Sequence, residues 1–105
     1  MTIIEFMKIL KATGYPVAYS HFTEATKPPY ICFLVDGSPN MMADNKVHHK
    51  INDINIELYT IKKDLNAELA LEEILDTHEI PYSSGPDVYI QSEKIFQKIY
   101  EVRLM

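Results

Sequence analysis

The first apolar positions of the chain repeat with the period of an α-helix. Thr2 and Glu5 form a capping box, in which each side chain satisfies a free backbone N–H at the start of a helix. The residues that follow place four apolar side chains on one helical stripe: Ile3, Phe6, Ile9 and Leu10. Gly14 suits the left-handed backbone conformation with which many helices end. The pattern therefore predicts an amphipathic helix between Thr2 and Gly14.

Two later segments have the composition and the period of β-strands. The run YICFLV, Tyr30–Val35, is apolar at every position, which is typical of a strand covered on both faces or lying at an interface. From Asp53 to Leu58 polar and apolar residues alternate, which indicates a strand with one solvent-exposed face. Upstream the apolar residues lie in the opposite phase, so a bulge is expected at Asn52-Asp53. We therefore expect one long, bent strand over Val47–Ile61 that offers an unpaired edge.

The last part of the chain predicts a second helix and then further strands. Asp64 is expected to cap a helix that runs from Leu65 to about His78, and Pro81 is expected to stop it. The helix residues predicted to face inward are Leu65, Leu69, Leu71, Ile74 and Leu75. The segments expected after the helix are a loop at 83–87, a brief strand at 88–90 and a turn at 92–94. The final strand is expected to turn four side chains inward: Phe96, Tyr100, Val102 and Leu104.

The order of these elements predicts an α+β fold. Helix, strands, helix and strands in succession are typical of a mainly antiparallel sheet with two helices packed on one face. The sequence contains no repeat and no low-complexity tract, and 105 residues are enough for one hydrophobic core. We therefore predict a single α+β domain over residues 1–105.

Charge and cysteine content disfavour several classes of protein. The formal net charge of −5 argues against a nucleic-acid clamp, which normally carries a basic stripe. The single cysteine, Cys32, allows no intramolecular disulfide and no cysteine-rich zinc site, and its apolar neighbours predict an unreactive thiol. Glu5, Lys8 and Lys11 interrupt the first apolar segment, which argues against a signal peptide or a membrane span. We expect a protein made in the cytoplasm, without specific nucleic-acid binding and without a membrane.

The groups that could carry chemistry do not form a catalytic or metal-binding pattern. His48 and His49 are neighbours, and neighbours on a strand point to opposite faces, so the pair is poorly placed to bind one ion. Asp44 and Glu57 could begin a nuclease-like cation site, but Tyr59 stands where a lysine would be expected. We therefore predict no catalytic residue, no metal ligand and no cofactor, and a protein that is not an enzyme.

The remaining candidate is a surface for contact with other chains. The loop from Ser38 to Asn45 carries apolar residues between turn-forming residues, and its methionines could adapt to a partner surface. The alternative is that these side chains pack back onto the sheet as loop anchors. Together with the start of the bent strand, the loop gives the predicted interface residues: Pro39, Met41, Met42, Asp44, Asn45, Lys46, Val47, His48 and His49.

Three segments carry a resemblance to one family of phage proteins. They are PVAYSHF at 16–22, ADNKV at 43–47 and IELYT at 56–60, within a likeness that extends over nearly the whole chain. The chain resembles the tail terminator, or tail-to-head joining, proteins of long-tailed phages and prophages of Gram-positive bacteria. The likeness is thin at 83–87, and the family pattern contains no invariant functional residue.

The resemblance implies a structural role in virion assembly. Tail terminators form a homo-oligomeric ring, typically of six subunits, that caps the tail tube at its final length and offers its other face to the head connector. The implied partners are copies of the chain itself, the major tail tube protein, and the head connector or completion protein. The implied location is the host cytoplasm during assembly and then the junction of tail and head in the virion.

Three alternatives stay open at this stage. A head-completion or neck protein would come from the same phage neighbourhood and would bind DNA-filled heads. A small metal-dependent nuclease would use Asp44 and Glu57 as its core. A free-standing regulatory binding module would be a monomer with affinity for a host protein and none for tails.

Overall fold

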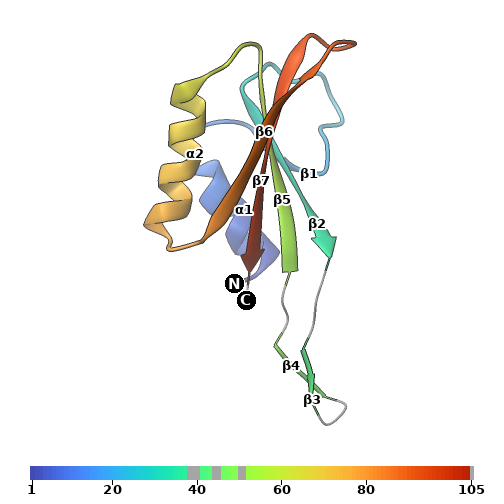
Figure 1. Cartoon of the computed structure of the whole chain (residues 1–105), viewed down its shortest axis with the longest axis vertical. Coiled ribbons are helices and arrows are strands. Elements are labelled where there is room, and N and C mark those ends of the chain that lie inside the picture. Colours follow the sequence, from blue (N-terminus) through green and yellow to red (C-terminus); the bar gives the residue numbers. More distant parts are fainter. Residues whose placement is uncertain (38–40, 44–45, 50–51, 105) are drawn as a thin grey trace.

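The computed structural model describes residues 1–37, 41–43, 46–49 and 52–104, with only the backbone described at 41–43 and 46–49. Two helices and seven strands follow in the order α1 (Ile3–Lys11), β1 (Val17–Tyr19), β2 (Tyr30–Gly37), β3 (Met41–Ala43), β4 (Lys46–His49), β5 (Asn52–Thr60), α2 (Leu65–Thr77), β6 (Tyr82–Ile90) and β7 (Ile95–Leu104). Five strands form one sheet in the order β1-β2-β5-β7-β6, and β3 pairs with β4 in a separate hairpin. Strand β1 runs parallel to β2, and the other neighbours are antiparallel. The predicted α+β class is confirmed (Figure 1).

Helix α1 begins and ends as its sequence predicts. The Glu5 backbone N–H donates to Thr2 Oγ1 at 3.1 Å, and the Thr2 N–H donates to Glu5 Oε1 at 3.2 Å, which completes the capping box. Phe6 and Leu10 are fully buried on its inner face. Gly14 has a φ of 90°, the left-handed conformation that glycine adopts without a steric cost.

Helix α2 has the predicted cap but a different inner face. The Ala67 N–H donates to Asp64 Oδ1 at 3.0 Å, as expected of an N-cap aspartate. The fully buried residues of α2 are Ala67, Leu71 and Leu75, whereas Leu65 and Leu69 are 64% and 54% exposed. The inward placement of Leu65 and Leu69 was therefore wrong. Both lie two positions before a buried residue, which is more than half a turn around a helix of about 3.6 residues per turn.

Strand β5 is the centre of the sheet and has no free edge. It pairs with β2 on one side and with β7 on the other, and every residue of β5 from Asn52 to Thr60 has a partner on β7. The predicted long strand with an unpaired edge is therefore wrong, because its first part forms the separate strand β4. The bulge predicted at Asn52-Asp53 is wrong as well, because both residues pair in regular register with β7. The register shifts instead on the neighbouring strand, between Val35 and Gly37 of β2. Asp36 is the residue inserted there.

The segment at 83–87, predicted as a loop, belongs to β6. It pairs with β7 on both sides of Gly85 and Pro86, and the register shifts between Ser84 and Asp87. Strand β6 lies at the edge of the sheet, where a proline is tolerated because no second neighbour needs its missing N–H. A Gly-Pro pair therefore marks a bulge in this edge strand instead of the end of a strand.

The hydrophobic core lies between the two helices and one face of the sheet. Alternate residues of the central strands point into it, among them Phe33, Ile56 and Tyr100, and each of these side chains is fully buried. Val102 and Leu104 of β7 are buried as predicted, and Phe96 is half-buried on the same face. Both helices contribute to this single core cluster, so both cover the same face of the sheet. The opposite face is the open face described below.

Candidate functional site

The hairpin of β3 and β4 projects beyond the end of the sheet. Figure 1 shows it as a narrow arm that continues the direction of β2 and β5, at the end of the molecule where both termini lie. The longest dimension of the molecule is 50 Å, against 29 and 26 Å for the other two. We call β3 and β4 the arm. In the arm, Met41 pairs with His49, Met42 with Val47 and Ala43 with Lys46.

The arm carries most of the interface residues predicted from the sequence. Met41 and Met42 lie on β3, and the stretch from Lys46 to His49 is β4. Within the loop predicted from Ser38 to Asn45, Met41–Ala43 is therefore a strand. The backbone of this strand leads away from the sheet, so it gives no support to the alternative in which the loop packs back onto the sheet. Pro39, Asp44 and Asn45 lie outside the described residues.

The open face of the sheet carries a row of polar groups across its central strands. Registers place Tyr59 of β5 between Tyr30 of β2 and Gln97 of β7. Gln97 Nε2 donates to the Tyr59 hydroxyl at 2.9 Å, and that hydroxyl donates to Glu57 Oε1 at 2.9 Å. Burial, opposed by the Gln97 hydrogen bond and reinforced by Glu57, raises the pKa of Tyr59 well above its usual range. The phenol therefore stays neutral and acts as a hydrogen-bond bridge between strands.

Glu57 is one of the two carboxylates of the nuclease alternative. It ends the row of side-chain hydrogen bonds that runs from Gln97 through Tyr59 on the open face. It is half-buried and accepts a hydrogen bond from the Tyr59 hydroxyl. Asp44, its suggested partner, lies outside the described residues. Across the part of the chain that the structure describes, no three histidine, cysteine or acidic residues are grouped as metal ligands would be.

Cys32 lines one hollow on the open side of the sheet together with Phe22, Tyr30 and Tyr59, and we call these three aromatic side chains the cover. The Cys32 side chain is 3% exposed, and burial, with a contribution from Glu57, raises the thiol pKa to about 11. Phe22, from the connection between β1 and β2, packs edge-on against Tyr30, which in turn stacks on Tyr59 at 4.9 Å. The thiol is therefore a buried apolar group and a poor nucleophile at neutral pH.

The sequence matches no protein-family model and no curated protein.

No helix in the described ranges is long and apolar enough to cross a lipid bilayer. The longer helix, α2, has 13 residues and carries four acidic side chains.

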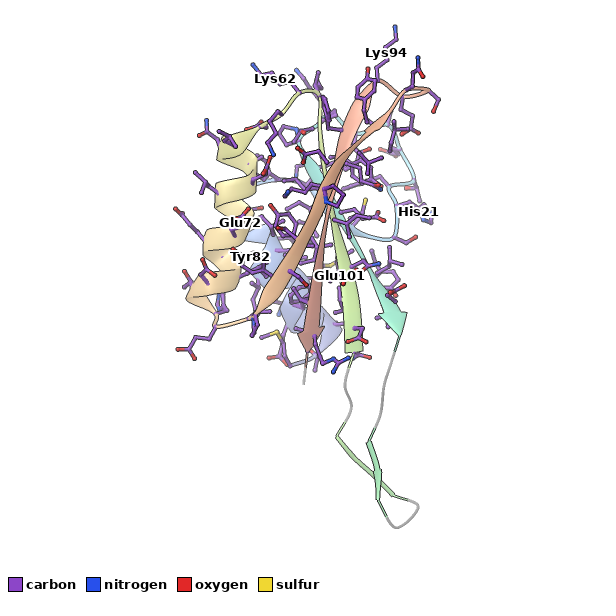
Figure 2. The ribbon with its side chains drawn as sticks, viewed as in Figure 1. His21, Lys62, Glu72, Tyr82, Lys94 and Glu101 are labelled. Atoms are coloured by element: carbon purple, nitrogen blue, oxygen red, sulfur yellow. The ribbon has the colours of Figure 1, made fainter. Side chains whose placement is uncertain are left out.

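A half-buried carboxylate, that of Glu72, joins α2 to the sheet through two tyrosines, and no pattern in the sequence indicated it. The Tyr100 hydroxyl donates to Glu72 Oε2 at 2.7 Å, and the Tyr82 hydroxyl donates to Glu72 Oε1 at 3.4 Å. Figure 2 shows Glu72 on α2 directed toward Tyr82 on β6. Burial and the Glu72 carboxylate raise the pKa of Tyr100 well above its usual range. In the sequence, Glu72 is one of several glutamates of an apparently solvated helix face.

The two edges of the sheet differ in length and in the direction in which they pair. Strand β1 is three residues long, from Val17 to Tyr19. Strand β6 is nine residues long, and its side chains Val88 and Tyr89 are 46% and 49% exposed. Unlike edges on one subunit are compatible with head-to-tail contact between copies, in which two different patches meet. The arm, the open face and these edges are the candidate interaction surfaces.

Proposed function

We propose that this chain is a structural tail terminator, or tail-to-head joining, protein of a long-tailed phage or prophage, acting as a homo-oligomeric ring. Its partners would be copies of itself, the major tail tube protein and the head connector. The observation that carries the proposal is the arm, which extends beyond the folded body at the position of the predicted interface. The sequence resemblance described above supports the same assignment.

The arm suits contact with a partner that lies beyond the ring of folded bodies. A two-stranded hairpin standing away from a core buries little apolar surface of its own and is marginally stable alone. Contact with another protein would supply the missing burial. In a ring, each copy would hold its arm at the same height, so that six arms could reach a tube or connector with the matching symmetry.

The folded body suits a subunit of a closed ring. A cyclic assembly needs two different patches on each subunit that complement each other. The sheet offers a short parallel edge at β1 and a long antiparallel edge at β6, and each edge carries exposed apolar side chains. No catalytic group is needed for this role, which is carried by shape and surface.

Electron microscopy of particles made without the protein tests the proposal. We expect overlong or headless tails when the gene is deleted from the phage that encodes it, because nothing then stops tube growth or presents a docking face. The wild-type gene supplied in trans should restore tails of normal length joined to heads. Normal tails attached to heads in the deletion would contradict the proposal.

A variant confined to the arm separates its role from that of the body. Residues 38–51 would be replaced by a short turn that joins β2 to β5, which are already paired in the sheet. We expect a folded protein that fails to restore head-to-tail joining. The far-ultraviolet circular dichroism spectrum of the purified variant is the control for folding, and full restoration by this variant would contradict the role of the arm.

A further inference from the structure

Helix α1 presents an exposed stripe that is apolar at one end and basic at the other. Ile4 is 71% exposed, and Lys8 and Lys11 are exposed as well. The spacing of four and three residues puts the three side chains on one face of the helix. The opposite face holds the buried Phe6 and Leu10. We call Ile4, Lys8 and Lys11 the α1 stripe.

Helix α2 presents an exposed stripe of the opposite charge. Leu65 and Leu69 are the two leucines predicted to be buried, and Glu73 and Asp76 continue the same face toward the end of the helix. The spacings of four, four and three residues keep these four side chains in line. Two exposed leucines one turn apart form a continuous apolar surface, which differs from a single exposed apolar residue. We call these residues the α2 stripe.

The charged groups of both stripes are free of ion pairs within the described residues. The ion pairs of this part of the chain lie elsewhere, on Lys63, Lys98 and Arg103. Lys8 and Lys11 thus offer two cations, and Glu73 and Asp76 offer two anions, and in each helix the charged pair follows the exposed apolar residues along the same stripe. The two surfaces complement each other in charge.

The two stripes belong to opposite halves of the helical layer. Helix α1 lies on the side of β1 and β2, where Phe6 packs edge-on against Phe33 at 5.7 Å. Helix α2 lies on the side of β7 and β6, where Glu72 accepts from Tyr100 at 2.7 Å. The chain therefore carries its basic stripe near one edge of the sheet and its acidic stripe near the other.

We propose that the α1 stripe of one copy packs against the α2 stripe of the next copy. The contact is head-to-tail, so each copy uses both stripes, and the series closes into a ring when the rotation between copies allows it. Like stripes repel each other, because α1 against α1 joins four lysines and α2 against α2 joins four carboxylates. The closure of this series into a ring rests on the proposed function, whereas the contact between the two stripes does not depend on it.

Zero-length cross-linking of the native protein tests the contact without any substitution. A carbodiimide joins a lysine amine to a carboxylate only where the two touch. Equal amounts of ¹⁴N- and ¹⁵N-labelled protein would be mixed at high concentration, cross-linked and analysed by peptide mass spectrometry. We expect mixed-isotope links from Lys8 or Lys11 to Glu73 or Asp76. Their absence, or links from these lysines only to other carboxylates, overturns the proposal.

Charge reversal in two separate chains gives a second test. One variant carries Lys8→Glu and Lys11→Glu, and the other carries Glu73→Lys and Asp76→Lys. In sedimentation velocity and cross-linking, each variant alone should associate at least tenfold more weakly than the native chain. Mixed in equal amounts, they should associate again as an alternating assembly, because every contact then joins opposite charges.

The matched control reverses two exposed charges outside both stripes. Glu24→Lys with Glu93→Lys makes the same change in net charge as the α2 variant and should leave association unchanged. Equal weakening by the control, or no recovery on mixing, overturns the proposal. Association that recovers on mixing, in a protein whose deletion leaves normal particles, would uphold the contact and refute the tail terminator role. If either single variant still joined tails to heads normally, the tail terminator role would stand and the contact between the stripes would be refuted.

Discussion

The two faces of the central strand β5 have opposite character, and their difference separates what folds this protein from what it offers to partners. Ile54, Ile56 and Leu58 point to the helices and are at most 1% exposed. Asn55, Glu57 and Tyr59 point to the open face and are half-buried among polar neighbours. The covered face supplies the hydrophobic stabilisation of the fold. The open face, the arm and the outer sides of the helices are therefore the surfaces left for contact.

The largest expected contrast is between neighbouring residues of β5. Ile56→Ala should lower the free energy of unfolding by about 2–5 kcal/mol, because it leaves a cavity between sheet and helices. Asn55→Ala, one residue away on the open face, should change it by less than about 1 kcal/mol. Urea denaturation followed by circular dichroism measures both. Similar losses for the two variants would show that the open face is also part of the core.

The reactivity of Cys32 tests the cover on the open side. With its pKa raised to about 11, the thiol is almost entirely protonated at pH 8, and burial limits access as well. We expect alkylation by iodoacetamide to be roughly a hundredfold slower in the folded protein than in urea, since the thiolate is the reactive form. Phe22→Ala removes part of the cover and should raise the rate. Equal rates in native and unfolded protein would mean that the cover is open in solution.

Two tyrosine hydroxyls donate to the Glu72 carboxylate, and we expect them to contribute unequally to the free energy of unfolding. Tyr100→Phe removes the 2.7 Å hydrogen bond and should cost about 1–3 kcal/mol of unfolding free energy, because the bond is made to a charged group. Tyr82→Phe removes the 3.4 Å contact and should cost less. Denaturant melts of the two variants give the order. A larger loss from Tyr82→Phe would reverse the assignment of the stronger bond.

The smallest effect is expected at the exposed pair of Asp53 and Arg103 on the open face. The Arg103 guanidinium donates to Asp53 Oδ1 at 2.7 Å and holds the pKa of that carboxyl below its usual value. A lowered folded-state pKa stabilises the protein above the unfolded pKa, and this contribution is lost as pH falls through the folded value. NMR titration should show the Asp53 pKa rising in Arg103→Ala, with little change in stability at neutral pH. An unchanged pKa would mean that the pair is not formed in solution.

The sequence predicted local features whose cause lies within a few residues. The capping box of Thr2 and Glu5, the Asp64 cap and the two-residue alternation of β5 each depend on neighbours along the chain, and each is present in the structure. The class of the fold followed from the order of such elements.

Features that depend on distant residues were not predictable in the same way. Helix α2 has leucines on two sides, and only packing against Tyr100 and the sheet decides that Leu71 is buried and Leu69 is exposed. Strand β6 contains a Gly-Pro pair that signals a loop, yet pairing with β7 extends it through that point. The predicted interface residues that the structure describes, Met41, Met42 and Lys46–His49, lie on the arm, and pairing of β2 with β5 holds the two strands that lead to it side by side.

Gold labelling of assembled particles tests the central claim most directly, namely that this chain acts through contacts at the junction of tail and head. Particles carrying an epitope-tagged copy would be purified, labelled with antibody-coated gold and imaged by electron microscopy, with untagged particles as the control. The account predicts gold at the junction of tail and head and at no other part of the particle. Gold at the tail tip, or particles that contain none of the protein, would contradict it.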